Sequence, residues 1–374
     1  MRIRPFEAAL RWSLRAIKSL DWRDDDSHLL RAAEVRCVLL VSSTALGDTV
    51  MSTAAFGPLR QRFPTARFVA VIHESSLQLF RHCAEIDEAV PARSGWHGFL
   101  DLAIRLRGYR PDIAVILHGN EPQATPLAYL AGARWIFKLP NARNPFRFLL
   151  ANRATTVTVG ELGHGLDQRL RTAALAGAAV EGARMRLPEV PGASERVEAF
   201  FLAADFAPGR RVAMQCGASA ASRMWPAGKF VDLGRRLRLA HPDIGVVLTG
   251  SPAERAYLDG IARGIGGTAT IVTAGELPIE CLPALVASCA CLVTGDTGTM
   301  HVAFALEVPA VCLFAVSDPA TSGPPYDHER HVVIHRPCPD LAIRTKSDDA
   351  RCIARIEVDE VIAAVTGVLA RKAG

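Results

Sequence analysis

The sequence predicts an α/β protein built from two doubly wound domains, each organised around a parallel sheet. Short apolar runs that suit buried strands alternate with helical segments, first from Val35 onward and again from Arg211 onward. The 374 residues exceed what one ordinary core holds, and 49% hydrophobic with 22% charged residues is a globular composition. Two domains of ordinary size are therefore expected.

The first series begins with a strand whose following loop holds Asp48. The helix after that loop should stop before Pro64, because proline disfavours helical backbone in the residue before it. The expected elements are a strand over 35–41, a loop over 42–48, a helix over 49–63, a strand over 67–72, a helix over 75–82 and a strand over 113–117.

The second series has the same alternation and ends its fourth strand in a Gly-Asp-Thr-Gly-Thr turn. The expected strands are 211–215, 244–248, 270–272, 291–293 and 310–314, and the expected helices open at Trp225, run over 253–265 and 281–288, and begin again at Met300. In doubly wound sheets ligands bind beyond the carboxyl ends of the strands, so two such sheets facing each other make a cleft.

The alternation weakens between the two series, where Pro188, Pro191 and Gly192 occur. The expected division is an N-terminal amphipathic extension over 1–34, an N-terminal domain over 35–185, a linker over 186–207, a C-terminal domain over 208–350, and a C-terminal helix over 351–374 that packs back towards the N-terminal domain.

Charge and cysteine usage narrow the function classes. The balance of 43 basic to 38 acidic residues suits an anionic partner, while basic stripes with interleaved aromatic residues are missing, so nucleic acid is not expected. The nine cysteines are odd in number and mostly lie in apolar runs, which predicts reduced thiols and a cytoplasmic protein. His328, His331, His335 and Cys338 fit a polar surface loop better than a metal site.

The N-terminus lacks a bilayer-spanning segment and a signal peptide, yet it has an amphipathic pattern. Apolar residues recur at helical spacing among basic ones; they are Phe6, Leu10, Leu14, Ile17 and Leu20. Such a helix can lie on an anionic membrane surface or dock on its own domain, and both alternatives remain open.

Two turns could carry chemistry. Asp48 follows the first strand, without the G-x-G-x-x-G of a dinucleotide site; it is either an N-cap for a helix from Thr49 or a general base in a cleft. The turn Gly295–His301 points backbone N–H groups beyond a strand end, which suits either an N-cap or a phosphate.

Further polar residues of the second half lie on neighbouring loops. Ser219 and Arg223 precede Trp225, and a guanidinium can bind phosphate oxygens in two-point fashion. Glu254 stands where a carboxylate commonly receives ribose hydroxyls, or acts as a first-turn acid. Lys229 fits a solvated helix face, and Asp318 either lines the same crevice or makes a turn.

Together these motifs resemble glycosyltransferase family nine, the bacterial ADP-heptose:lipopolysaccharide heptosyltransferases. The resemblance rests on four motifs in order and runs from Val35 to the final helix. They are Ala45-Leu46-Gly47-Asp48, Gly217-Ala218-Ser219 with Trp225-Pro226, Gly295-Asp296-Thr297-Gly298-Thr299-Met300-His301, and Phe314 with Ser317-Asp318-Pro319.

The resemblance implies a GT-B fold, with the acceptor on the N-terminal Rossmann-like domain and the sugar nucleotide, ADP-heptose, on the C-terminal one. It further implies an inverting transfer that needs no metal and no cofactor beyond this donor, at the cytoplasmic face of the inner membrane, onto a lipopolysaccharide-core or related acceptor. Asp48, supported by Gly47, matches the catalytic base. The positions matching the donor site are Ser219, Arg223, Glu254, Asp296, Thr297, Gly298, Thr299 and His301.

Four residues depart from the family pattern: Arg223 stands for a lysine, Gln215 and Cys216 precede Gly217, and Ala315 follows Phe314 in place of glycine. Two other functions fit the same fold. One is a non-catalytic protein that binds sugar nucleotides, against which the retained Asp48 argues. The other is an epimerase that isomerises a sugar nucleotide without an acceptor.

Overall fold

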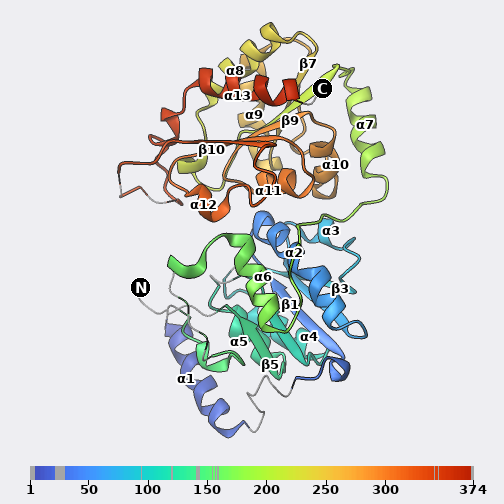
Figure 1. The fold of residues 1–374 in the computed structure, drawn as a ribbon, viewed down its shortest axis with the longest axis vertical. Coiled ribbons are helices and arrows are strands. Elements are labelled where there is room, and N and C mark those ends of the chain that lie inside the picture. Colours follow the sequence, from blue (N-terminus) through green and yellow to red (C-terminus); the bar gives the residue numbers. More distant parts are fainter. Residues whose placement is uncertain are drawn as a thin grey trace. The chain divides into compact units, whose positions relative to one another are not determined.

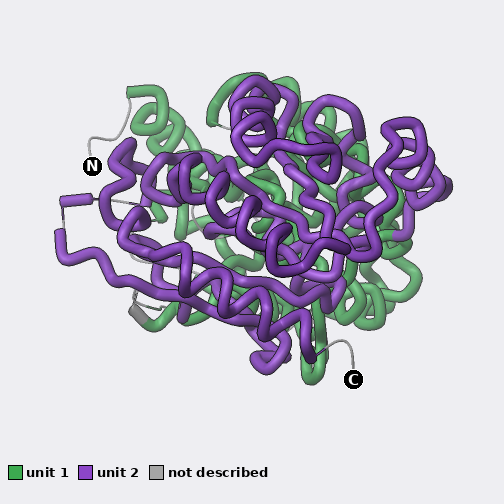
Figure 2. The backbone as a smooth tube through the Cα atoms, turned by 90° about the horizontal axis from the view of Figure 1, so that it is seen from above, with its two compact units in different colours: residues 1–188 green, residues 189–374 purple. Residues whose placement is uncertain are grey.

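The chain folds into two compact units, residues 1–188 and 189–374 (Figure 2). The computed structural model describes residues 5–21, 30–93, 95–118, 121–139, 144–153, 155, 157, 160–340, 342–343 and 345–371. Each unit contains one parallel sheet with helices against it, so the predicted α/β class with two doubly wound sheets is confirmed (Figure 1).

The sheet of the first unit has five parallel strands in the order β3-β2-β1-β4-β5. They are β1 (Cys37–Ser42), β2 (Arg67–His73), β3 (Glu88–Ala92), β4 (Ile113–Ile116) and β5 (Trp135–Lys138). Every residue of β1 is buried, as expected of a central strand covered on both faces. The strand order reverses between β1 and β4, which makes their carboxyl ends the switch point where ligands bind in such sheets.

Six α-helices accompany this sheet among the described residues. They are α1 (Pro5–Leu20), α2 (Leu46–Arg62), α3 (Leu77–Phe80), α4 (Phe99–Arg107), α5 (Ala124–Leu130) and α6 (Gly165–Leu175), with short 3₁₀ turns at Ala32–Glu34, Arg147–Leu149 and Gly160–Leu162. Helices α2 and α6 pack against each other (Figure 1).

Helix α1 docks on its own unit through one face only. Leu14 is buried in the core of the first unit, Leu10 packs against that core, and the Phe6 ring lies 5.2 Å from the Trp96 ring. The opposite side leaves Trp12 76% exposed and Leu20 86% exposed. The docked alternative is thus confirmed for one face. Arg2, Arg4 and Trp22 lie outside the described residues.

The sheet of the second unit has six parallel strands in the order β11-β10-β9-β6-β7-β8. They are β6 (Arg210–Gln215), β7 (Ile244–Thr249), β8 (Thr270–Val272), β9 (Cys291–Gly295), β10 (Ala310–Phe314) and β11 (His331–His335). Here the strand order reverses between β6 and β9. The carboxyl ends of these two strands are therefore the second switch point.

Helices of the second unit are α7 (Ala193–Ala203), α8 (Ala227–Ala240), α9 (Arg255–Ile265), α10 (Leu282–Ala287), α11 (Gly298–Ala305), α12 (Pro319–Ser322) and α13 (Val358–Arg371), with 3₁₀ turns at Ala221–Arg223, Pro252–Glu254, Ile279–Cys281 and Ile353–Arg355. Trp225 is fully buried, and its indole N–H donates to the Ile356 carbonyl at 3.0 Å. This bond ties the start of α8 to the segment before α13.

The structure adds detail to two segments of the expected domain plan. Residues 193–203 of the expected linker form α7, whose Val197 and Phe201 are buried. The apolar stripe of helix α13, Val361, Val365 and Val368, lies in the core of the second unit. The expected packing of this helix towards the N-terminal domain stays a prediction. The spacing of that stripe matches one helix face, which α8 and the sheet cover.

The cysteine prediction is wrong at one pair. Cys338 and Cys352 form a disulfide across 14 residues, while the other seven cysteines are buried free thiols. The two paired residues lie in loops that flank the second sheet rather than in the apolar runs used for the prediction. Within the described residues, no helix is long and apolar enough to cross a membrane.

Candidate active site

Asp48 lies in the first turn of α2, directly beyond the end of β1. Helix α2 begins at Leu46 with Ala45 as its N-cap, three residues earlier than predicted, so the expectation that Asp48 caps a helix from Thr49 is wrong. Gly47 is buried in the same turn. The Thr49 hydroxyl donates to the Ser42 carbonyl at 3.2 Å, which fastens this turn to the strand end.

The Asp48 carboxylate pairs with an arginine that comes from α6. Arg169 is only 3% exposed, and its Nη2 lies 2.7 Å from Asp48 Oδ1 and 2.9 Å from His118 Nδ1. His118, which follows β4, has Nδ1 3.4 Å from the same carboxylate oxygen. Burial lowers the pKa of Arg169, and the Asp48 carboxylate opposes that shift. One buried cation thus joins the loops beyond β1 and β4.

A second polar group lies beside the first. Ser43 donates to Glu121 Oε2 at 2.5 Å, and the Lys138 ammonium donates to the Glu121 carbonyl at 3.1 Å. Burial raises the pKa of Glu121, and the charge of Asp48 raises it further. Burial also lowers the pKa of Lys138 to about 8. The first switch point therefore concentrates side-chain charges of both signs.

At the second switch point the backbone supplies the chemistry. Helix α11 begins at Gly298 with Thr297 as N-cap, two residues earlier than predicted, so the first-turn N–H groups belong to Gly298, Thr299 and Met300. The Thr297 side chain does not cap the helix; its hydroxyl lies 2.8 Å from the Thr294 hydroxyl. A helix start of this kind binds anions through unpaired N–H groups and the helix dipole.

Arg223 links this turn to the loop after β6. Its Nη1 donates to the Asp296 carbonyl at 3.0 Å and lies 3.5 Å from Asp296 Oδ2, while Nη2 donates to the Ser219 hydroxyl. A Cβ at Gly295 would lie 2.4 Å from the Arg223 carbonyl oxygen, so only glycine allows this approach. Arg223, Ser219 and Asp296 are thus brought together, as the sequence predicted for a donor site.

Gln215, one of the departures from the family pattern, joins the same loops. Its Oε1 accepts from the Thr299 hydroxyl at 2.9 Å, and its Nε2 donates to the Gly217 carbonyl at 3.1 Å. The amide therefore fixes the first turn of α11 against the loop after β6.

Glu254 has a capping role and also faces the strand ends. Its Oε2 accepts from the backbone N–H and the hydroxyl of Ser251 at 2.7 and 2.8 Å, which forms a capping box. A Cβ at Gly217 would lie 1.6 Å from Glu254 Oε1, so this carboxylate packs directly on the loop after β6. Both sequence interpretations, first-turn acid and crevice carboxylate, describe part of its position.

Three other residues that the sequence singled out are buried or bonded to the backbone. His301 is 4% exposed and packs edge-on against Phe304, with 5.8 Å between ring centroids. The prediction that Lys229 lies on a solvated helix face is wrong. Its ammonium donates to the carbonyls of Ala354 and Ile356 at 2.8 and 2.7 Å. Asp318 caps the short helix α12 by accepting from the Ala320 N–H at 2.9 Å.

The sequence interpretation missed Arg169, His118, Glu121 and Lys138. A signal for Arg169 was present, because it occupies the buried face of α6 together with Leu166 and Ala173, at spacings of three and four residues. An arginine within an apolar helical stripe must find a buried anion, since an unpaired charge there is costly.

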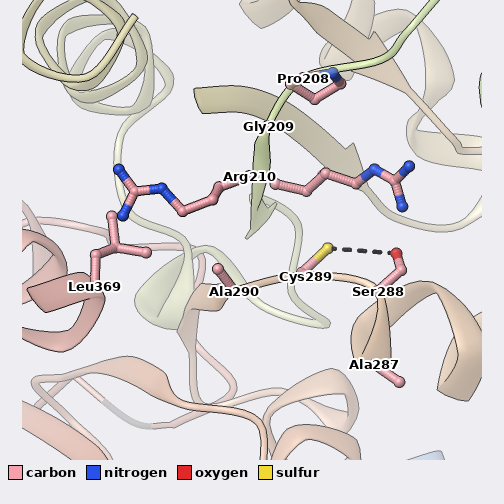
Figure 3. A pocket seen from close by; sticks show the side chains of 9 residues that line it. Pro208, Gly209, Arg210, Ala287, Ser288, Cys289, Ala290 and Leu369 are labelled. Carbon is pink, nitrogen blue, oxygen red and sulfur yellow. Dashed lines mark hydrogen bonds between the residues drawn. The ribbon is translucent and has the colours of Figure 1, made fainter. Parts of the chain in front are cut away.

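A pocket of about 470 Å³ lies elsewhere in the second unit (Figure 3). Its lining includes Arg210 at the start of β6 and Ala290 just before β9, so it is at the amino ends of the strands. It does not belong to the switch point. No group of three or more histidine, cysteine or acidic residues is arranged to hold a metal in the part of the chain that the structure describes.

Comparisons with known proteins agree with this arrangement. A family model described as glycosyltransferase family 9 (heptosyltransferase) matches residues 170–350. Lipopolysaccharide heptosyltransferase 2 of Salmonella typhimurium is 26% identical over 325 residues, which cover 79% of this chain and 87% of that protein.

Solved structures share the fold. The family 9 glycosyl transferase of Veillonella parvula matches with a TM-score of 0.74 at 19% identity, over 93% of this chain and 100% of that one. The ADP-heptose lipopolysaccharide heptosyltransferase II of E. coli matches with a TM-score of 0.72 at 22% identity, over 90% and 99% of the two chains. The two Rossmann-like units are therefore those of a GT-B fold.

Proposed function

Because the chain belongs to glycosyltransferase family 9 and is a glycosyltransferase, we propose that it transfers heptose from ADP-heptose to a lipopolysaccharide-core or related cell-envelope acceptor. The observation that carries this proposal is the chemistry of the two switch points. One holds a carboxylate beside a buried cation, and the other holds an anion-binding helix start with an arginine.

The donor is assigned to the second unit. The first-turn N–H groups of α11 and the hydroxyl of Thr297 suit the diphosphate, and Arg223 adds a cation that the diphosphate can share with Asp296. Glu254 would accept hydrogen bonds from the ribose hydroxyls through Oε1, the oxygen that packs on Gly217. Support for an adenine nucleotide and a heptose comes from the similarity to the ADP-heptose lipopolysaccharide heptosyltransferase II of E. coli.

The acceptor is assigned to the first unit, with Asp48 as general base. The acceptor oxygen forms a bond to the anomeric carbon while its proton passes to the Asp48 carboxylate. The bond from the anomeric carbon to the diphosphate oxygen breaks, and ADP leaves with the electron pair. One attack from the side opposite the leaving group inverts the anomeric configuration.

Stabilisation of the departing ADP needs fixed positive charge near the diphosphate. The α11 dipole and the Arg223 guanidinium supply it from the protein itself, so the proposed transfer does not depend on a metal ion. We expect that turnover survives the addition of a chelator.

A product analysis tests the reaction class. The enzyme is incubated with ADP-heptose and a soluble lipopolysaccharide-core acceptor, with and without EDTA, and the products are followed by NMR. The expected result is ADP release with one new anomeric signal of inverted configuration, equal in both samples. Loss of donor without acceptor, giving an isomerised sugar nucleotide, would instead identify an epimerase. Binding without consumption would identify a non-catalytic protein.

The assigned base is tested by Asp48→Ala. The variant should lose transfer almost completely and keep its affinity for ADP, because the donor site belongs to the second unit. Glu74→Ala, which removes an exposed carboxylate of the same unit that pairs with Arg93, is the matched control. Undiminished turnover in Asp48→Ala would overturn the assignment.

We also propose that α1 brings the enzyme to the cytoplasmic face of an anionic membrane, where its lipid-linked acceptor lies. The face of α1 that is not docked exposes two large apolar side chains, those of Trp12 and Leu20. Arg11, Arg15 and Lys18 occupy the same helix and match anionic headgroups in charge.

Vesicle sedimentation tests the proposal that α1 binds the membrane. Trp12→Glu combined with Leu20→Glu should release the protein from vesicles that contain anionic lipid and leave turnover on a soluble acceptor unchanged. Ser19→Glu adds one acidic residue on the same helix without removing apolar area and serves as the control. Equal binding by the double variant and the wild type would show that α1 is a packing element only.

A further inference from the structure

One nitrogen of the Arg169 guanidinium contacts two groups of the candidate active site. Nη2 is 2.7 Å from Asp48 Oδ1 and 2.9 Å from His118 Nδ1. An arginine nitrogen can only donate, and an –NH₂ group carries two hydrogens. Both contacts are therefore satisfied together only if His118 Nδ1 accepts a hydrogen bond.

This requirement fixes the state of the histidine. An accepting Nδ1 carries a lone pair, so the ring proton resides on Nε2 and the imidazole is neutral. A protonated ring would place an N–H where Arg169 already donates, and would put two cations in contact. The distance of 3.4 Å between His118 Nδ1 and Asp48 Oδ1 is then a separation between two acceptors that share one donor group.

The position of Arg169 is built into the packing of α6 on α2. Helix α6 begins at Gly165, where a Cβ would lie 2.9 Å from Met51 Sδ and 3.3 Å from Arg169 Nη1. The same Nη1 donates to the Gly165 carbonyl at 2.8 Å. A glycine at the start of the helix thus leaves room for the guanidinium beside α2, and the guanidinium is locked to its own helix.

We infer that Arg169 is the positioning residue of the transfer reaction: it orients the Asp48 carboxylate, keeps it ionised, and holds His118 neutral with its proton on Nε2. This inference rests on the proposed role of Asp48 as base. Within the described part of the chain, the charged groups that face Asp48 are Arg169 from α6 and, after β4, His118 and Glu121. Asp48 disfavours the ionised form of Glu121. Arg169 is the cation of this set in the assigned state.

Arg169 acts through Asp48, so its loss should change the pH dependence of turnover. In Arg169→Gln the carboxylate loses its cation and needs a higher pH to ionise. The acid limb of kcat against pH should move upward by roughly one to two pH units, and kcat at neutral pH should fall about 10- to 100-fold. The KM for the sugar nucleotide should stay unchanged, because its site lies in the other unit.

Two further variants make the result specific. Arg169→Lys keeps the charge and a donor, and should restore the acid limb to near its wild-type position while recovering only part of kcat. Arg171→Gln removes an exposed arginine from the same helix and should behave as the wild type. An acid limb that stays in place in Arg169→Gln would overturn the inference.

The tautomer gives a readout that needs no variant of Arg169. In the wild-type enzyme labelled with ¹⁵N-histidine, the His118 signals, assigned by their loss in His118→Gln, should show a lone-pair Nδ1 and a protonated Nε2 at neutral pH. A protonated Nδ1 would contradict the inference even if Arg169→Gln fails to fold. Full turnover by Asp48→Ala would instead remove the proposed base while leaving the tautomer assignment intact.

Discussion

The two switch points occupy equivalent places in two similar sheets, but they are equipped differently. Beyond β1 and β4 the protein places charged side chains in contact, with Arg169 buried between Asp48 and His118. Beyond β6 and β9 it relies on backbone N–H groups, hydroxyls and one partly exposed arginine. Proton transfer needs an ionisable side chain in a controlled state, whereas a diphosphate needs dipoles fixed in advance. Under the proposed assignment, the carboxyl ends of the strands serve proton transfer in one unit and diphosphate binding in the other.

The largest effect that would separate the two sites is expected from Arg223→Met. The variant loses a cation and two hydrogen-bond donors at the donor site, and KM for the sugar nucleotide should rise by roughly 10- to 100-fold. The acid limb of kcat against pH should not move. A shift of that limb would mean that the two sites are not chemically separate. Steady-state kinetics across pH make the measurement.

Lys138→Met, in the first unit, is expected to change the pH dependence of stability. Burial lowers the pKa of Lys138 from 10.5 to about 8, so the folded protein binds a proton less readily than the unfolded chain between these values. Stability should therefore fall as the pH drops from about 10.5 to 8 and stay level below.

Lys138→Met lacks this fall, so its free energy of unfolding relative to the wild type should be about 2–3 kcal/mol higher at pH 7 than at pH 10. Lys346→Met, at an exposed lysine, is the control. Denaturant unfolding of the wild type and both variants at pH 7 and pH 10 gives the measurement. A difference between Lys138→Met and the wild type that is equal at the two pH values would contradict this account of Lys138.

His331, a buried titratable group of the second unit, is expected to make stability depend on pH in the acid range. His331 is 5% exposed, lies 4.7 Å from the Phe304 ring, and burial lowers its pKa from 6.5 to about 4. The unfolded chain takes up a proton first as the pH falls, so stability decreases between pH 6.5 and 4.

His331→Phe should make the acid-induced loss of unfolding free energy smaller by about 2–3 kcal/mol. His328→Gln, at an exposed position, should show the same loss as the wild type. The midpoint of thermal unfolding between pH 7 and pH 4.5 is the observable. Equal acid sensitivity in His331→Phe and the wild type would show that other groups govern the acid stability of this unit.

The smallest effect is expected from Thr297→Val. The hydroxyl lies at the α11 start without capping the helix, so its loss should leave folding intact and remove one contact to the diphosphate. A rise in the donor KM of roughly 2- to 10-fold is expected. Thr321→Val, which removes a hydroxyl that bonds the Asp318 carbonyl in the same unit, is the control.

The central strands were predictable because both faces of them are buried. Cys291–Leu292–Val293 and Ala310–Phe314 read as continuous apolar runs, and the structure confirms both as strands. Strands β3, β5 and β11 escaped prediction; they carry Pro91, Lys138 and two histidines, and lie at or next to sheet edges. Short edge strands bury less apolar area and leave a weaker pattern.

The residues of the candidate site were predictable only where they belong to a recognisable motif. The turn Gly295–His301 carries its own signature, whereas Arg169 reaches Asp48 across 121 residues. Such a pairing depends on how α6 packs against α2, which no local pattern of the sequence records. Helix starts were placed two or three residues late in both α2 and α11, because Gly47 and Gly298 resemble loop residues.

Calorimetric titration of ADP into Asp48→Ala and Arg223→Met tests the division between the two sites most directly, with transfer activity measured on the same samples. We predict that Asp48→Ala binds ADP as tightly as the wild type and transfers nothing, while Arg223→Met binds ADP at least tenfold more weakly. If Asp48→Ala weakened ADP binding as much as Arg223→Met does, the assignment of base and donor to separate units would be contradicted.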